Sequence, residues 1–353
     1  KHALRWVWSG KEGRANWAAG DDRWYQAPSY PTVSGENVTP TSAQQLSAVY
    51  ACVRLIRETI ASLPCHVMQY SADGRSKKRI AYEHPLYRLL HDEPNPEITS
   101  FELLEYIWDH IELRGNAYTF IERSRSGKVI ALWPLHPDRT KVERKDGQKL
   151  YSWRDNSGMF KPIPSNQMLH LPQNFDGLKG HSCIETVAEA IGAGLAVQAF
   201  GSAFFNHGAH FSTLVSLEAG LKPDDKEALK RALGPTGPYG GAKNAGSTIF
   251  IDKNKMTAQR LTVQPNEAQF LETQKFTVIQ IARMFGVPPT MIADLEKATY
   301  SNVEQEMIKF VTHCLRPRIV RMERAMERSL LTPKERESYF IRFNVDALLR
   351  GDT

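Results

Sequence analysis

Two histidines in the segment FFNHGAH have the spacing that metal ligands use on a helix. His207 and His210 lie three residues apart, so their imidazoles can share one helix face. No third ligand lies nearby in the sequence, and we therefore expect ordinary histidines near a helix end. Asp224 and Asp225 are adjacent and cannot flank a substrate as an acid–base pair. We expect them to start a helix instead, where negative charge is favoured.

Other motifs that bind phosphate or carry out catalysis are missing from the sequence. It contains no G-x-x-x-x-G-K-[ST] loop, no G-x-S-x-G turn and no H-E-x-x-H helix. The glycine-rich run GPTGPYGGAK has neither the spacing of that loop nor its final Ser or Thr, which indicates a flexible connection. We therefore expect no catalytic residues, no metal and no cofactor, and a protein that is not an enzyme.

Length, charge and cysteine content set broad limits on the class of protein. The chain has 353 residues, enough for two or three ordinary domains, and its formal net charge is +6. This mild basic excess permits a polyanionic partner but does not require one. The four cysteines form no C-x-x-C pair and match no zinc pattern, which indicates buried thiols in a reducing compartment. Because the chain opens with Lys1 and no signal segment follows, we expect a fragment or a processed form.

Apolar spacing and boundary residues predict most of the helices. The expected helices cover about residues 43–62, 85–91, 100–114, 184–206, 224–233, 267–285 and 302–331. Two of them begin with the capping-box pattern, formed by Ser42 with Gln45 and by Thr99 with Glu102. Pro317 lies inside the last helix and is expected to kink it.

The remaining patterns predict strands. CHVMQY and KKRIAY flank the turn Asp73-Gly74 and indicate a hairpin. Residues 117–171 alternate between apolar and polar side chains in several short runs, and STIFID and SYFIRFN read as further strands. The fold class expected from these elements is α+β.

The helix expected near residues 184–206 has an unusual composition. Its residues 187–205 are nearly apolar, but Glu189 and Gln198 interrupt them, and the run is at the short limit for a membrane span. We therefore expect a buried or ring-packed helix and no membrane. Small residues allow such a helix to pack closely against its neighbours, and they are Gly192, Gly194, Ala196, Ala199, Gly201 and Ala203.

Positive charge gathers in three places. They are residues 75–79 (RSKKR), residues 139–145 (RTKVERK) and the last helix, which carries Arg316, Arg318, Arg321, Arg324 and Arg328. Glu323 and Glu327 interleave with these arginines, which favours a solvated or intersubunit ion-pair face. Direct contact with phosphates is the alternative.

Several segments, taken in order, resemble a known family. SAVYACVRLIRETIASLPCHV, HPLYRLLHDEPNP and SFELLEYIWDHIELRGNAYTFIER are followed by ARMFGVPPTMIAD and TYSNVEQEMIKFVTHCLRP. Together these segments resemble the portal proteins of long-tailed bacteriophages, and the similarity covers about residues 41–350. The part from MFGVPP to YSNVEQ, with a proline inside the following helix, is the most specific.

The resemblance implies a portal fold with a mixed α/β wing, a two-helix stem, a small α/β clip, a tunnel loop and a long kinked wing helix. The expected parts are an irregular arm (1–40), the wing (41–184 and 302–353), the stem helices (185–210 and 264–286), the clip (211–263) and the tunnel loop (287–301). Family members usually continue into helices called the crown, so we expect a truncated chain.

The resemblance also implies partners and a location. Such subunits form a ring, typically of twelve copies, at one vertex of the capsid. Double-stranded DNA passes through the ring without sequence specificity during packaging and ejection. The clip binds the terminase motor and later the head-completion or adaptor protein, and the wing meets major capsid and scaffold proteins. The expected location is the virion, after assembly in the host cytoplasm.

Two sets of site residues follow from the resemblance. The tunnel loop would lie at the narrowest part of the channel and would contain Pro288, Pro289, Asp294, Glu296, Lys297 and Tyr300. In the clip, the acidic helix start formed by Asp224, Asp225 and Glu227 would bind basic surfaces.

A plain interhelix loop on the ring exterior is the alternative for residues 287–301. For the whole chain, the alternatives are an accessory subunit of a DNA-processing enzyme and a capsid or tail protein without a DNA channel.

Overall fold

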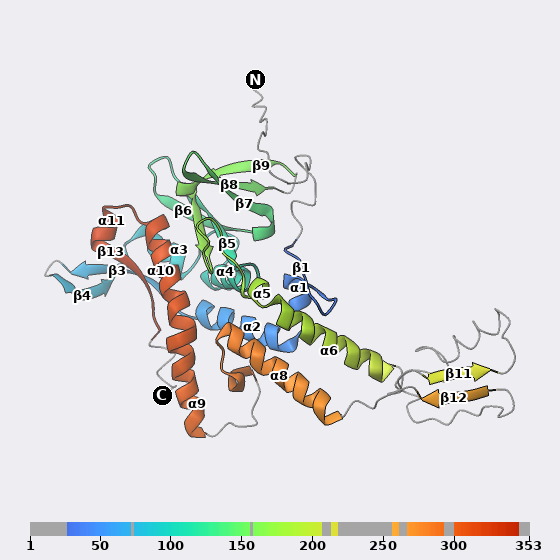
Figure 1. Cartoon of the computed structure of the whole chain (residues 1–353). Helices are drawn as coiled ribbons and strands as arrows, with labels where there is room; N and C mark the ends of the chain where they lie inside the picture. Colours follow the sequence, from blue (N-terminus) through green and yellow to red (C-terminus); the bar gives the residue numbers. More distant parts are fainter. Residues whose placement is uncertain are drawn as a thin grey trace.

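A mixed helical and sheet body, from which two helices extend side by side, makes up the computed structural model of the chain (Figure 1). The structure describes residues 27–71, 74–155, 158–206, 213–217, 256–260, 267–292 and 300–345. Its sheets are antiparallel and its helices segregate around them, which confirms the expected α+β class.

The first helical region differs from the prediction. Strands β1 (Tyr30–Pro31) and β2 (Asn37–Val38) precede the short helix α1 (Pro40–Ala43) and helix α2 (Ser47–Ala61). The expected single helix over 43–62 and the Ser42–Gln45 capping box are wrong. The amide of Ser42 donates to the hydroxyl of Thr39 at 3.0 Å, and the amide of Thr39 donates to the hydroxyl of Ser42 at 2.8 Å. The box therefore starts α1, where Pro40 already has a helical φ, and α2 begins separately.

The hairpin predicted around Asp73-Gly74 is present as β3 (Cys65–Ser71) and β4 (Gly74–Ile80). The late strand β13 (Tyr339–Phe343) joins this hairpin and gives the order β13-β3-β4. Helices α3 (Pro85–His91) and α4 (Ser100–Arg114) follow. The Thr99–Glu102 capping box of α4 is confirmed, and so is its stop at Gly115, whose φ is 73°. A Cβ at Gly115 would lie 2.4 Å from the backbone of His181, so only glycine fits there.

The β region predicted for residues 117–171 is confirmed. It consists of β5 (Asn116–Arg123), β6 (Val129–Leu135), β7 (Thr140–Lys145), β8 (Gln148–Arg154), β9 (Phe160–Pro164) and β10 (Met168–Pro172), with 3-10 turns at Pro137–Arg139 and Ser165–Gln167. They form two antiparallel sheets, ordered β10-β5-β6 and β7-β8-β9.

The second half of the chain is mainly helical. Its elements are α5 (Cys183–Thr186), α6 (Ala188–Asn206), β11 (Thr213–Leu217), β12 (Met256–Arg260), α8 (Glu267–Phe285), a 3-10 turn (Pro289–Ile292), α9 (Tyr300–Lys309), α10 (Arg316–Leu330) and α11 (Glu335–Ser338). The helix predicted over 184–206 is therefore two helices that meet at Val187.

The long helix predicted over 302–331 contains an irregularity just before Pro317. A π-helical turn, Phe310–Leu315, joins α9 to α10. There the amide of Arg316 donates to the carbonyl of Val311, five residues earlier. Pro317 has no amide hydrogen, so it cannot make an α-helical hydrogen bond, and a local departure from α-helix is the expected response.

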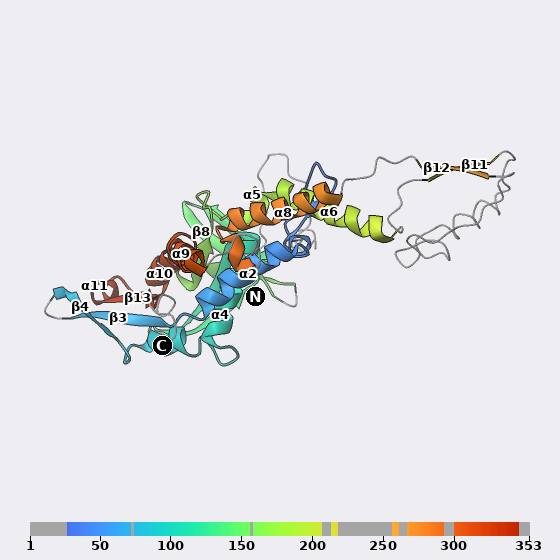
Figure 2. The ribbon, with the colours of Figure 1, turned by 90° about the horizontal axis from the view of Figure 1, so that it is seen from below.

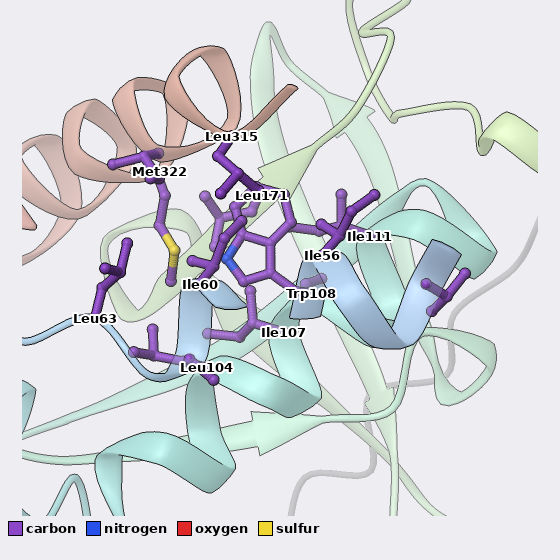
Figure 3. Packing of buried hydrophobic residues seen from close by; sticks show 14 of the residues in the cluster. Ile56, Ile60, Leu63, Leu104, Ile107, Trp108, Ile111, Leu171, Leu315 and Met322 are labelled. Atoms are coloured by element: carbon purple, nitrogen blue, oxygen red, sulfur yellow. The ribbon is translucent and has the colours of Figure 1, made fainter. Parts of the chain in front are cut away.

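The largest buried cluster lies where α2, α4, α10 and β10 meet (Figure 3). Trp108 is at its centre, near Ile56 and Ile107, and Leu171 and Met322 close it from the sheet and from α10. The cluster joins residues from both halves of the chain, so the body has one main core. All four cysteines have free thiols, and burial raises the pKa of the Cys52 thiol to about 12.

A buried ion pair crosses this core. The Nε of Arg318 lies 2.7 Å from Oε1 of Glu112, and the two side chains are 13% and 0% exposed. Arg318 also donates to the carbonyl of Phe285 at 3.1 Å and to that of Cys314 at 2.9 Å. Burial opposes the charge of Arg318, but Glu112 raises the pKa of this guanidinium above its ordinary value. Arg318 thus connects α10, α4 and the end of α8.

We expect Arg318→Met to lower the free energy of unfolding by about 3–5 kcal/mol, because it leaves the Glu112 carboxylate buried without a partner. Chemical denaturation followed by circular dichroism measures the change. Arg324→Met is the matched control: Arg324 lies on the same helix and is 72% exposed, so its loss is expected to cost about 1 kcal/mol or less. Equal effects of the two substitutions would contradict the role given to Arg318.

Candidate subunit-packing helices and channel connector

Helices α6 and α8 lie side by side and extend together beyond the body in both views (Figures 1 and 2). The inner face of α6 contributes Ile191 and Leu195 to the core, and α8 contributes Ile281 and Phe285 near its end. Strands β11 and β12 pair with each other beyond the far ends of the two helices. The chain therefore leaves the body through one helix and returns through the other.

The small residues of α6 do not all face the same way. A Cβ at Gly192 would lie 2.5 Å from the hydroxyl oxygen of Thr32, and a Cβ at Gly194 would lie 2.9 Å from Cγ2 of Thr277 in α8. These two glycines therefore allow close packing within the chain itself. Which neighbours these glycines face could not be predicted from the sequence, because Thr32 and Thr277 are distant along the chain.

The other small residues have different surroundings. Ala199 is exposed, Ala196 is half-buried and Gly201 is buried, while the side chain of Ala203 lies outside the described residues. Two large apolar side chains are exposed on the same helix pair: Phe200 of α6 (45%) and Phe276 of α8 (55%). Sequence reasoning missed both phenylalanines: Phe200 lies in a nearly apolar run, and Phe276 stands beside Lys275 and Thr277 in α8.

The segment after α8 is anchored at its start. Gly286, with φ of 72°, ends the helix as predicted, and the amide of Val287 donates to the carbonyl of Ala282 at 2.9 Å. Pro288 and Pro289 are half-buried and lead into the 3-10 turn. The hydroxyl of Thr290 hydrogen-bonds the carboxylate of Glu306, which ties this turn to α9.

The middle of the connector is not among the described residues. Asp294, Glu296 and Lys297 lie outside them, and Tyr300 is the first residue of α9, with no side-chain description. Both flanks of this middle segment, at Ile292 and at Tyr300, belong to regular structure. Its position relative to a channel stays a prediction.

Most of the expected clip also lies outside the described residues. Four predicted features cannot be checked because they fall outside the described residues. They are the acidic residues Asp224, Asp225 and Glu227, the helix expected at 224–233, the strand STIFID and the pair His207 and His210. Only β11 and β12 are described in this region. Within the described part of the chain, no cluster of three or more His, Cys, Asp or Glu side chains has the arrangement of a metal site. In that same part, none of the helices combines the length and apolar character that a membrane crossing requires.

Charges on α10 are arranged differently from the expected ion-pair face. Glu323 is 3% exposed and accepts hydrogen bonds from the amide of Phe343 at 2.9 Å and from Arg342 at 2.7 Å. Glu327 accepts from the amide of Ile341 at 3.3 Å and from Arg324 at 3.0 Å. Both carboxylates thus face strand β13. Sequence spacing could not reveal this, because their partners are backbone groups of a later strand.

Comparisons with known proteins agree with this architecture. The profile described as Phage portal protein matches residues 47–353. The portal protein of Enterobacteria phage HK97 is 30% identical over 317 residues, covering 88% of this chain and 72% of that protein. The probable portal protein of Streptomyces phage phiC31 is 32% identical over 334 residues, covering 90% and 71%.

Solved structures share the fold. An HK97 family phage portal protein from Corynebacterium diphtheriae has a TM-score of 0.66 at 14% identity, covering 89% of this chain and 98% of that one. A chain from the neck of an empty gene transfer agent particle has a TM-score of 0.60 at 23% identity, covering 84% and 80%. With the family match, these findings identify the class: the chain has the fold of HK97-type portals. It belongs to the phage portal protein family, whose members are structural head–tail connectors rather than enzymes.

The two kinds of small residue on α6 lead to a testable difference. Gly194→Phe would collide with Thr277 and Leu46 of the same chain, so we expect it to destabilise the single subunit by about 1–3 kcal/mol or more. Ala199→Phe changes an exposed position and leaves the subunit folded, but we expect it to block ring assembly by steric overlap with a neighbouring copy.

Thermal melting of the unassembled protein and the ring yield in size-exclusion chromatography separate these effects. Normal ring yield from Ala199→Phe would show that this face of α6 is not a subunit contact.

Proposed function

We propose that copies of this chain assemble into a ring around a channel for double-stranded DNA at one vertex of the capsid. One observation supports this most: α6 and α8 leave the body with Phe200 and Phe276 exposed, although their inner faces are already packed within the chain. Large apolar side chains on an extending helix pair are stabilised when a neighbouring copy covers them. Membership of the portal family is consistent with this arrangement.

The parts of the chain then take separate roles in the proposal. Helices α6 and α8 form the stem, and residues 211–263 form the clip, which binds the terminase motor and later the head-completion protein. Residues 41–184 and 302–353 form the wing, which meets major capsid and scaffold proteins. The ring has twelve copies in the virion and assembles in the host cytoplasm. Residues 287–301 form the tunnel loop.

Imaging of the purified protein tests the proposal. We expect negative-stain electron microscopy to give rings with a central hole, and symmetry-resolved imaging of the particle to place α6 and α8 around the channel. Monomers under all conditions would contradict the ring. A nuclease or ATPase activity of the purified chain would favour the alternative of a DNA-processing subunit.

The connector has properties that suit a moving DNA partner. DNA that is being translocated has to be surrounded without strong binding, since each phosphate contact must break at every step. Pro288, Pro289 and the Thr290–Glu306 hydrogen bond hold one side of the connector. Lys297 and the acidic residues Asp294 and Glu296 give its middle a mixed charge. In the proposal, Lys297 approaches passing phosphates without sequence preference.

Deletion of residues 293–298 is therefore expected to widen the channel and to impair packaging or retention of DNA, while rings still form. Ring yield by electron microscopy and the DNA content of particles measure the two effects. Normal DNA retention in intact particles would argue against a tunnel loop at this position. So would an assembled structure in which the segment lies on the outer rim.

Charge reversal at Asp224, Asp225 and Glu227 tests the clip. We expect the triple lysine variant to weaken binding to the motor or to the head-completion protein, because these carboxylates are proposed to pair with basic surfaces. A pull-down with purified partners measures the binding, and size-exclusion chromatography checks that rings remain. Unchanged binding would contradict the docking role of these residues but would not contradict the proposed ring.

A further inference from the structure

Strand β13 is the edge of the sheet β13-β3-β4, so the amides on its free side need acceptors. The amides of Ile341 and Phe343 point away from β3 and donate to Glu327 and Glu323 of α10. The free edge is thereby covered by two carboxylates from the helix that lies beside it. A partner is consequently prevented from adding a strand to this part of the edge.

This arrangement has an electrostatic consequence for the arginines around α10. The carboxylate of Glu323 accepts hydrogen bonds from the amide of Phe343 and from Arg342. The carboxylate of Glu327 accepts hydrogen bonds from the amide of Ile341 and from Arg324. Glu335 is also occupied, since its carboxylate accepts from the amide and the hydroxyl of Thr332. Glu323, Glu327 and Glu335 are therefore already hydrogen-bonded, and Glu337 of α11 is exposed to solvent.

Two arginines remain with their guanidinium groups unpaired. Arg328, in the last turn of α10, and Arg336, in α11, are both exposed, and neither makes a side-chain hydrogen bond or ion pair with the described residues. The surroundings of Arg328 add more positive charge. Burial lowers the pKa of Lys149, and the nearby charges of Arg144 and Arg328 lower it further, while Asp176 opposes them.

Both arginines line a surface groove with two hollows. The first hollow, of about 370 Å³, is bounded by the rings of Tyr70, Tyr339 and Phe340. Arg324 and Glu327, which pair with each other, also line it. The second, of about 500 Å³, is bounded by Ser165, Asn166, Leu331 and Pro333. Arg328 and Arg336 are common to the two hollows, so they lie where these meet. The residues of the first hollow come from α10, α11, β13 and the end of β3, and α10, α11 and β13 lie on the side of the body away from the free ends of α6 and α8 (Figure 1).

We propose that this groove binds an acidic, partly apolar peptide segment of a partner protein, with its carboxylates paired to Arg328 and Arg336. Guanidinium groups bind carboxylates through two parallel hydrogen bonds, and the aromatic wall of the first hollow suits apolar side chains next to them. The concave shape favours a peptide over duplex DNA, because a duplex is too wide to enter hollows of this size and could touch only their rims. The inference goes beyond the channel function and does not depend on it.

Fluorescence anisotropy with the full chain tests the proposal. The probe is a fluorescein-labelled peptide in which Asp and Glu alternate with Leu and Phe, and a labelled DNA duplex is the second probe. We expect the double variant Arg328→Gln, Arg336→Gln to bind the peptide about tenfold more weakly or worse, since two charge-assisted pairs are lost. The matched control, Arg125→Gln with Arg316→Gln, removes the same charge at exposed positions outside the groove and is expected to bind normally.

The possible results separate the alternatives. Equal weakening in both double variants would mean that overall charge, and not the groove, attracts the peptide, and would overturn the proposal. Loss of duplex binding with unchanged peptide binding would make the groove a nucleic-acid site and would also overturn it. All four substituted arginines are exposed, so equal melting temperatures are expected and confirm that the variants are folded. Ring assembly is not needed for any of these measurements.

Discussion

The ion pair between Arg318 and Glu112 is the interaction on which the arrangement of the helices in the body depends. The pair is buried, so its polar atoms require partners, and Arg318 finds them in Glu112 of α4, in Phe285 of α8 and in Cys314 of the π-helical turn. One of them is the carbonyl of Phe285, at the end of α8. The position of the extending helix pair relative to the core is therefore linked to an interaction inside the core.

Helix α6 makes contacts within the chain on one side and carries exposed apolar surface that the proposed ring would cover. Gly192 and Gly194 bring α6 close to Thr32 and to α8, so the pair can extend as one unit. Phe200 and Phe276 on this unit are partly exposed, and the proposed ring would cover them. A subunit built in this way has a well-packed body and leaves apolar surface exposed along the helix pair. Proteins that assemble into closed rings need such a division between internal and external contacts.

Features set by neighbouring residues could be predicted from the sequence, and features set by distant contacts could not. The Thr99–Glu102 capping box and the stop at Gly115 were predictable because each depends on a few consecutive residues. The start of α2 was not, since Thr39 and Pro40 compete with the pattern at Ser42. The portal family was evident from the order of its motifs, although no sequence pattern indicated which subunit surface Gly194 faces. The role of Glu323 was predicted wrongly because its carboxylate accepts a hydrogen bond from the backbone of β13, a strand that begins sixteen residues later.

The π-helical turn in the long helix also lies where two parts of the body meet. Its residues Phe310, Val311, Cys314 and Leu315 are all buried, and Ile319 and Met322 follow Leu315 at spacings of four and three residues, so the apolar face continues into α10. Pro317 cannot donate a backbone hydrogen bond, and the wider turn before it accommodates this loss while the helix stays continuous. The carbonyl of Cys314, within the turn, accepts from Arg318 at 2.9 Å, and the thiol of Cys314 lies 3.5 Å from the carbonyl of Phe285. The irregular turn therefore sets the rotation of α10 about its axis, and with it the direction in which Arg318 enters the core.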